Sequence, residues 1–168
     1  MSSNLPKPVA INYWGDYVVS YTQSQVDYWS GAVTASQVYA ARFTWWGGLQ
    51  SQVSVGDTWD PRFESESSVS LDDSGRFVVA YTHQSRYDDR DVRAQVFDAN
   101  GNSAQGWFYV SSRSDSDEFA PTVALGNDGQ FVVGFGTYRQ KRAPTQTDPN
   151  TPPWDYRGYG VSIQRFAL

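Results

Sequence analysis

The sequence predicts an all-β fold built from three similar repeats, for three reasons. One phrase occurs three times, as GDYVVSYT at 15–22, GRFVVAYT at 75–82 and GQFVVGFG at 129–136. Aromatic residues make up 16% of the 168 residues. Such a composition favours strands, because aromatic and β-branched side chains pack well on a pleated sheet. Finally, the apolar residues follow no helical period.

Each repeat contains matched segments that predict strands. A first segment starts six residues before the repeated glycine, at 9–11, 69–71 and 123–125. The phrase itself is the second segment, and VYAARF, VRAQVF and VSIQRF form the third at 38–43, 92–97 and 161–166. A fourth appears in two copies, SQVSV ending at Val55 and WFYV ending at Val110. Short apolar segments recurring with a fixed period indicate a repeat architecture.

Turn residues between these segments predict hairpins. The first and second segments are separated by NYWGD, DDSGR and GNDGQ, whose glycine can adopt the positive φ of a tight turn. Four consecutive antiparallel strands are the blade of a β-propeller. We therefore predict a β-propeller-like fold of three four-stranded antiparallel repeats, the last lacking its outer strand, with a β-trefoil as the alternative. We expect residues 1–168 to form one domain, with repeats of approximately 5–63, 64–117 and 118–168.

Two segments resemble a known class of bacterial repeats. PTVALGNDGQFVV at 121–133 and AQVFDANG at 94–101 are similar to tandem repeats of large secreted or surface proteins. Those repeats follow the pattern PxVA, DGxFVVxW and AQRFDxxG. The resemblance implies a propeller-type scaffold and an extracellular setting for the parent protein, and it supplies no catalytic residues. Tyr21, Tyr81 and Phe135 stand where the pattern has Trp.

The unequal connections between the second and third segments are the predicted binding region. They run over 22–37, 82–91 and 136–160, and in a propeller they would all emerge on one rim. Each pairs a Tyr with an Asp, which suits a sugar ring or a protein surface. The alternative is that these aromatic side chains only pin the loops in place. The predicted ligand-binding residues are Asp27, Tyr28, Trp29, Tyr87, Asp88, Asp89, Trp154, Asp155, Tyr156 and Arg157.

The sequence contains few residues that point to catalysis or metal binding. The lone histidine, His83, is expected at the start of a loop without a catalytic role, and no Ser/His/Asp set stands out. Asp98, Asn100 and Asn102 could offer oxygens to calcium, although a hairpin turn explains them better. We therefore predict no catalytic residues, metal or cofactor. A net charge of −5 disfavours nucleic acid, and no apolar run is long enough for a membrane span or signal peptide.

The functional prediction is a non-enzymatic, lectin-like module that binds carbohydrate. A self-assembling structural unit without a ligand is one alternative, and a glycoside hydrolase is a more distant one. Three blades are too few to close a ring, so we expect a homo-oligomer, with a glycan or surface protein as a further partner. The adjacent Trp45 and Trp46 are expected at a turn on the opposite rim, with at least one exposed or at an interface.

Overall fold

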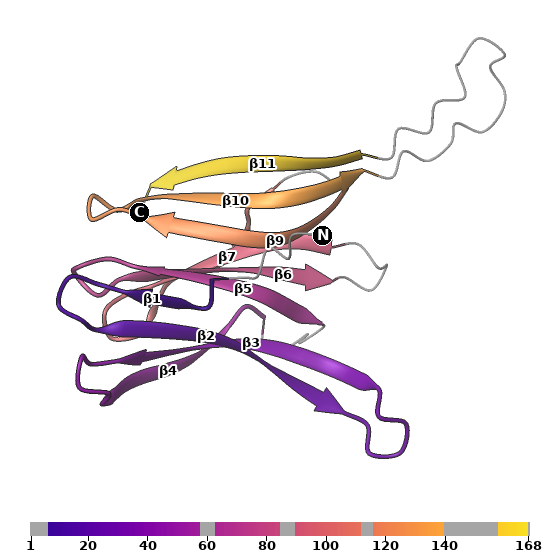
Figure 1. Ribbon diagram of the computed structural model, residues 1–168, viewed down its shortest axis with the longest axis horizontal. Helices are drawn as coiled ribbons and strands as arrows, with labels where there is room; N and C mark the ends of the chain where they lie inside the picture. Colours follow the sequence, from indigo (N-terminus) through magenta and orange to yellow (C-terminus); the bar gives the residue numbers. More distant parts are fainter. Residues whose placement is uncertain (1–6, 58–62, 85–89, 112–115, 140–157, 168) are drawn as a thin grey trace, which may run out of the picture.

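The computed structural model describes residues 7–57, 63–84, 90–111, 116–139 and 158–167, and this part of the chain is all-β without any helix. Eleven strands form three antiparallel sheets, which lie one above another in Figure 1. The first sheet contains β1 (Val9–Ile11), β2 (Tyr17–Val26), β3 (Val33–Phe43) and β4 (Leu49–Val55). The second contains β5 (Glu64–Leu71), β6 (Phe77–Gln84), β7 (Arg90–Phe97) and β8 (Ser103–Tyr109), and the third β9 (Ser116–Leu125), β10 (Gln130–Arg139) and β11 (Gly158–Ala167).

Every segment predicted as a strand lies in or directly beside a strand, and each sheet corresponds to one repeat. Within a sheet the strands follow chain order, so each pairs with its neighbours in sequence. The third sheet has three strands among the described residues, in agreement with a repeat that lacks its fourth segment. The three sheets are separate and open, with no pairing between described strands of different repeats, which does not match the closed barrel of the trefoil alternative.

The second and third strands are longer than the sequence indicated. In the first repeat, β2 and β3 continue their ladder through Gln25 and Ala35, and only 27–32 remain as a turn. The predicted loop at 22–37 is therefore mostly a two-stranded arm, which extends beyond the rest of the sheet in Figure 1. This extension is favourable because pairing satisfies backbone N–H and C=O groups that a loop would leave to water.

A stacked aromatic pair recurs at one register position in all three sheets. Tyr17 pairs with Phe43, Phe77 with Phe97, and Phe131 with Phe166, with ring centroids 4.9–5.0 Å apart. Directly opposite side chains on one face of a sheet are close enough for such stacking. The equivalent glycines before these strands all have φ between +82° and +88°. The repeats are thus alike in turn geometry as well as in sequence.

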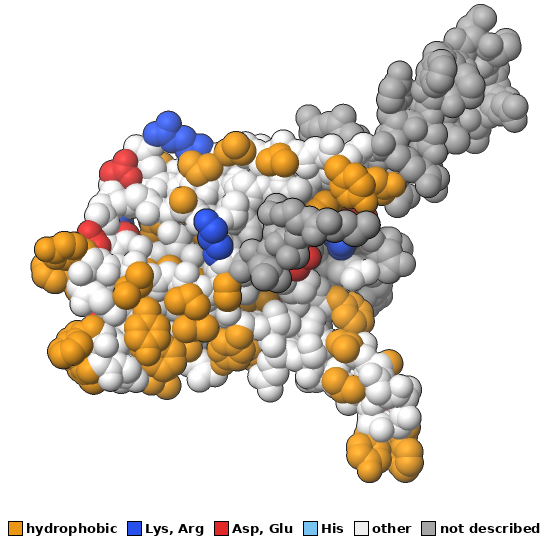
Figure 2. Space-filling view, in the orientation of Figure 1, with side chains coloured by type: hydrophobic (Ala, Val, Ile, Leu, Met, Phe, Trp, Pro, Cys, Tyr) orange, Lys and Arg blue, Asp and Glu red, His pale blue; other side chains and the backbone are white. Residues whose placement is uncertain are grey.

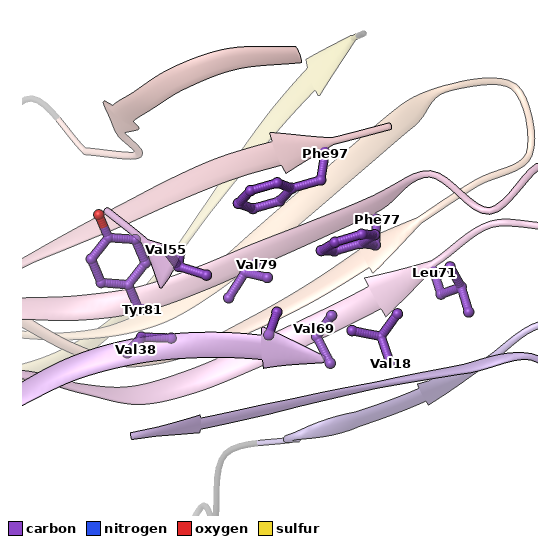
Figure 3. Close-up of a cluster of buried hydrophobic side chains, with 10 residues drawn as sticks. Val18, Val38, Val55, Val69, Leu71, Phe77, Val79, Tyr81 and Phe97 are labelled. Atoms are coloured by element: carbon purple, nitrogen blue, oxygen red, sulfur yellow. The ribbon is translucent and has the colours of Figure 1, made fainter. Parts of the chain in front are cut away.

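Two hydrophobic clusters join successive sheets. The cluster between the first and second sheets consists of Val18, Val38, Ala40, Val55, Val69, Leu71, Phe77, Val79, Tyr81 and Phe97, most of which Figure 3 labels. The cluster between the second and third sheets consists of Val78, Ala80, Val92, Ala94, Val96, Val110, Val123, Phe131, Val133 and Phe135. The adjacent valines of the repeated phrase point to opposite faces, as strand geometry requires. The middle sheet is therefore buried on both faces.

Candidate functional site

The candidate site within the described residues is the turn at the tip of the β2–β3 arm. Its conformation is fixed by Asp27, whose Oδ1 accepts hydrogen bonds from the Trp29 amide (3.1 Å) and from the amide and hydroxyl of Ser30 (2.7 Å each). The hydrogen bond from the Ser30 hydroxyl holds the pKa of the Asp27 carboxyl below its usual range. Gly31, with φ +69°, completes the turn and donates its amide to the Asp27 carbonyl.

The two aromatic residues of this turn point into solvent. Tyr28 is 88% exposed and Trp29 is 90% exposed. Their rings meet edge to face, with centroids 5.3 Å apart and planes at 86°. Hydrophobic side chains stand clear of the sheets at the end of this arm in Figure 2. Such exposure argues against the alternative that Tyr28 and Trp29 pin the loop onto the sheets.

The other seven predicted ligand-binding residues lie outside the described residues. Tyr87, Asp88 and Asp89 belong to 85–89, and Trp154, Asp155, Tyr156 and Arg157 belong to 140–157. Of the ten predicted ligand-binding residues, the structure therefore describes Asp27, Tyr28 and Trp29.

A second aromatic surface lies at the other end of the first sheet. Trp45 and Trp46 form the turn between β3 and β4 and are 68% and 67% exposed, which confirms the expectation that at least one would be exposed. Tyr13 and Trp14, in the turn between β1 and β2, are 82% and 65% exposed. The Trp45 amide donates to Asp16 Oδ1 (3.1 Å), which links the two turns. The equivalent turns of the second repeat are DDSG and DANG, so this aromatic character is particular to the first repeat.

A buried carboxyl group between the first and second sheets was not predicted from the sequence. Glu64 begins β5 and is fully buried. Its Oε2 accepts hydrogen bonds from the Val38 amide and from Gln37 Nε2, both 3.0 Å away in the first sheet. Burial raises the pKa of Glu64 to about 7, although the Val38 hydrogen bond and the Arg93 charge oppose this shift. Burial and the nearby Glu64 also raise the pKa of Tyr81.

This carboxyl group recurs in the next repeat. Glu118 in β9 occupies the position equivalent to Glu64, is 1% exposed and accepts a hydrogen bond from the Ser111 hydroxyl. Aligning the repeats would have revealed Glu64 and Glu118, because both stand at the same position of their repeats. Because the hydrogen bonds of Glu64 join two sheets, its role is to hold successive repeats together.

The structure places the two remaining candidates, His83 and Asp98, in a strand and in a turn. His83 lies within β6 rather than at the start of a loop and is 5% exposed, because β6 and β7 remain paired through Gln84. Asp98 Oδ1 accepts from the amides of Asn100 and Asn102 (2.8 Å each), which is the hairpin turn favoured over calcium. The side-chain hydrogen bond from Asn102 lowers the pKa of Asp98.

The described residues contain no cluster of three or more metal-ligating side chains. The same part of the chain includes no helix with the length and apolar character needed to cross a membrane. No protein-family model matches the chain, and no curated protein matches it significantly. The exposed aromatic surfaces of the first sheet are therefore the features of the molecule that point to a function.

Proposed function

We propose that this chain is a non-enzymatic carbohydrate-binding module carried on a propeller-type scaffold. The scaffold proposal is supported by the way the sheets converge. Some strands of different sheets approach each other closely, with several Cα atoms within 8 Å. In each such pair, one of the two strands is β5 or β9. These are the first strands of the second and third repeats. Sheets packed face to face are about 10 Å apart, so closer approach marks the place where two sheets converge. First strands gathered near a common axis are the arrangement of a propeller.

The observation that carries the binding proposal is the exposed pair at the tip of the β2–β3 arm. Tyr28 and Trp29 present about nine-tenths of their surface to solvent, although large aromatic side chains gain free energy from burial. The turn itself is held by Asp27, so the two rings contribute little to its conformation. Leaving both rings in water is therefore unfavourable for the free protein, and a bound ligand would cover them.

The chemistry of the tip favours a sugar over a flat protein surface. One face of a pyranose ring carries C–H groups that stack on an aromatic ring, and its hydroxyls bond to nearby polar groups. The Trp29 ring supplies the stacking face, and Asp27 and the Ser30 hydroxyl lie beside it in the turn. A stable protein interface buries about 800 Å² on each partner, which is far more than two rings at a hairpin tip provide.

A glycan array followed by calorimetry with the selected sugar tests this proposal. We expect selective binding by the wild type and at least a tenfold loss of affinity in Trp29→Ala, which corresponds to about 1.4 kcal/mol. Trp46→Ala is the matched control, because it removes another exposed tryptophan at the opposite end of the sheet and should leave the affinity unchanged. No binding on the array would contradict the proposal and favour a structural unit without a ligand. Equal losses in both variants would contradict a binding site at the tip of the β2–β3 arm.

A further inference from the structure

Each inter-sheet interface is formed by two different faces. We call the face that packs on the preceding repeat the leading face and the face that packs on the following repeat the trailing face. In the second sheet, both faces are buried, because it lies between the other two. Its leading face consists of six large side chains, each at most 7% exposed: Val69, Leu71, Phe77, Val79, Tyr81 and Phe97.

The first sheet carries the same six positions, but no repeat among the described residues precedes it to cover them. Strand register places Val9, Ile11, Tyr17, Val19, Tyr21 and Phe43 at the equivalent places. Of these, Val9 is 56% exposed, Ile11 67% and Tyr21 37%. Figure 2 shows hydrophobic side chains gathered over the part of the molecule that β1–β4 form. This leading face keeps the composition of an inter-sheet interface while remaining open to solvent.

The trailing face of the third sheet is also uncovered, since no described repeat follows it. Its trailing face includes Val132, Val161 and Ile163, which are 37%, 81% and 69% exposed. The equivalent residues of the first sheet, Val18, Val38 and Ala40, are at most 1% exposed and pack on the second sheet.

The trailing face of the third sheet differs from that of the second sheet at one register pair. Ile163 is larger than the equivalent Ala94 of the second sheet. It pairs in register with Gly134, which stands where the second sheet has Ala80. The glycine opposite Ile163 offsets part of the added volume, which eases packing against a neighbouring sheet.

We infer that the leading face of the first sheet docks on the trailing face of the third sheet of a second copy of this chain. The occupant follows from the two interfaces already present, in each of which a leading face of this composition packs on a trailing face. A second copy brings a trailing face that lacks a partner, and it covers both exposed faces by continuing the same stacking. Because the two faces differ, the contact is head to tail, and rotation between copies closes a ring, with two copies forming a six-sheet ring.

Light scattering coupled to size exclusion tests this inference with two single variants and their mixture. Ile11→Glu places a charge on the leading face and Ile163→Glu on the trailing face. Both side chains are about two-thirds exposed, so the isolated fold tolerates the charge. Val26→Glu is the matched control, because Val26 is 57% exposed on the β2–β3 arm, away from both faces.

We expect the wild type and Val26→Glu to have the mass of two or more chains, and each isoleucine variant to have the mass of one. An equimolar mixture of the two isoleucine variants should form a dimer, because one leading face and one trailing face remain intact between them. A wild type that stays monomeric at micromolar concentration overturns the inference and leaves another occupant for these faces. A mixture that stays monomeric overturns the head-to-tail geometry. Circular dichroism of each variant verifies the strand content.

Discussion

Glu64 makes the stability of the fold depend on pH in a direction opposite to that of most carboxylates. Its side chain is fully buried between the first and second sheets, and burial raises its pKa from 4.5 to about 7. Between these values, the folded protein holds a proton on Glu64 that the unfolded chain releases. The contribution of Glu64 to the free energy of unfolding is therefore greatest below about pH 4.5, falls as the pH rises to about 7, and is constant above that.

The size of this effect follows from the pKa difference. At about 1.4 kcal/mol per pKa unit, the shift from 4.5 to about 7 corresponds to about 3 kcal/mol of stability lost between pH 4.5 and 8. In Glu64→Gln, the side chain cannot ionise, and its amide oxygen can still accept the hydrogen bond from the Val38 amide. We expect the variant to exceed the wild type in stability at pH 8 by about 2–3 kcal/mol and to match it near pH 5.

Urea denaturation followed by tryptophan fluorescence measures this difference, since the chain has seven tryptophans. Unfolding curves at pH 5 and pH 8 for the wild type and for Glu64→Gln give the four free energies. Glu66→Gln is the control, because it makes the same chemical change two residues further along β5 and should leave the pH dependence in place. An equal loss of stability with rising pH in the wild type and in Glu64→Gln would refute the assignment of the effect to Glu64.

Substitutions at pairs of comparable positions test the effects of side-chain packing and of backbone strain on stability. In a monomeric background, Phe77→Ala should cost about 3–5 kcal/mol, and Tyr17→Ala, at the equivalent half-buried position, less than half as much by urea denaturation. Equal costs would contradict the difference in burial. Gly75→Ala should lower the melting temperature more than Gly31→Ala, although both glycines have positive φ. A Cβ at Gly75 would lie 2.7 Å from a guanidinium nitrogen of Arg42, which Asp16 and the Ala99 carbonyl hold in place. No atom lies within 4 Å of a Cβ at Gly31, and equal shifts would contradict the clash.

The strands could be predicted from the sequence because the three repeats can be compared with one another. The stacked pair Phe77 and Phe97 has counterparts at equivalent positions of the other two repeats, so periodicity supported what a single segment could not. The arm of β2 and β3 could not be predicted, because TQSQV at 22–26 is polar on both faces and lacks the alternation typical of a half-buried strand. Backbone pairing extends the ladder there, together with a hydrogen bond from the Thr34 hydroxyl to the Gln25 carbonyl.

The candidate site was predicted only in part, for reasons that differ between residues. Aromatic residues in a turn indicate a surface, and Tyr28 and Trp29 are indeed exposed at the tip. The sequence did not indicate that Asp27 would use its Oδ1 to hold the turn, since a carboxylate that binds a ligand and one that caps a turn look alike in sequence. Glu64 was missed because a charged residue at the start of a strand is usually exposed.

Head-to-tail docking has a consequence for carbohydrate binding that separates the two proposals. Copies related by rotation around one axis would present their Tyr28–Trp29 tips on the same rim, so an assembly would bind a dense glycan surface through several tips at once. Linked sites of this kind raise apparent affinity by about 10²–10⁴ over a single site. The monomeric Ile163→Glu variant should therefore bind a glycan-coated surface at least tenfold more weakly than the wild type, yet bind the free sugar equally well. Surface plasmon resonance and calorimetry measure the two affinities, and equal losses in both would mean that Ile163 affects the binding tip directly.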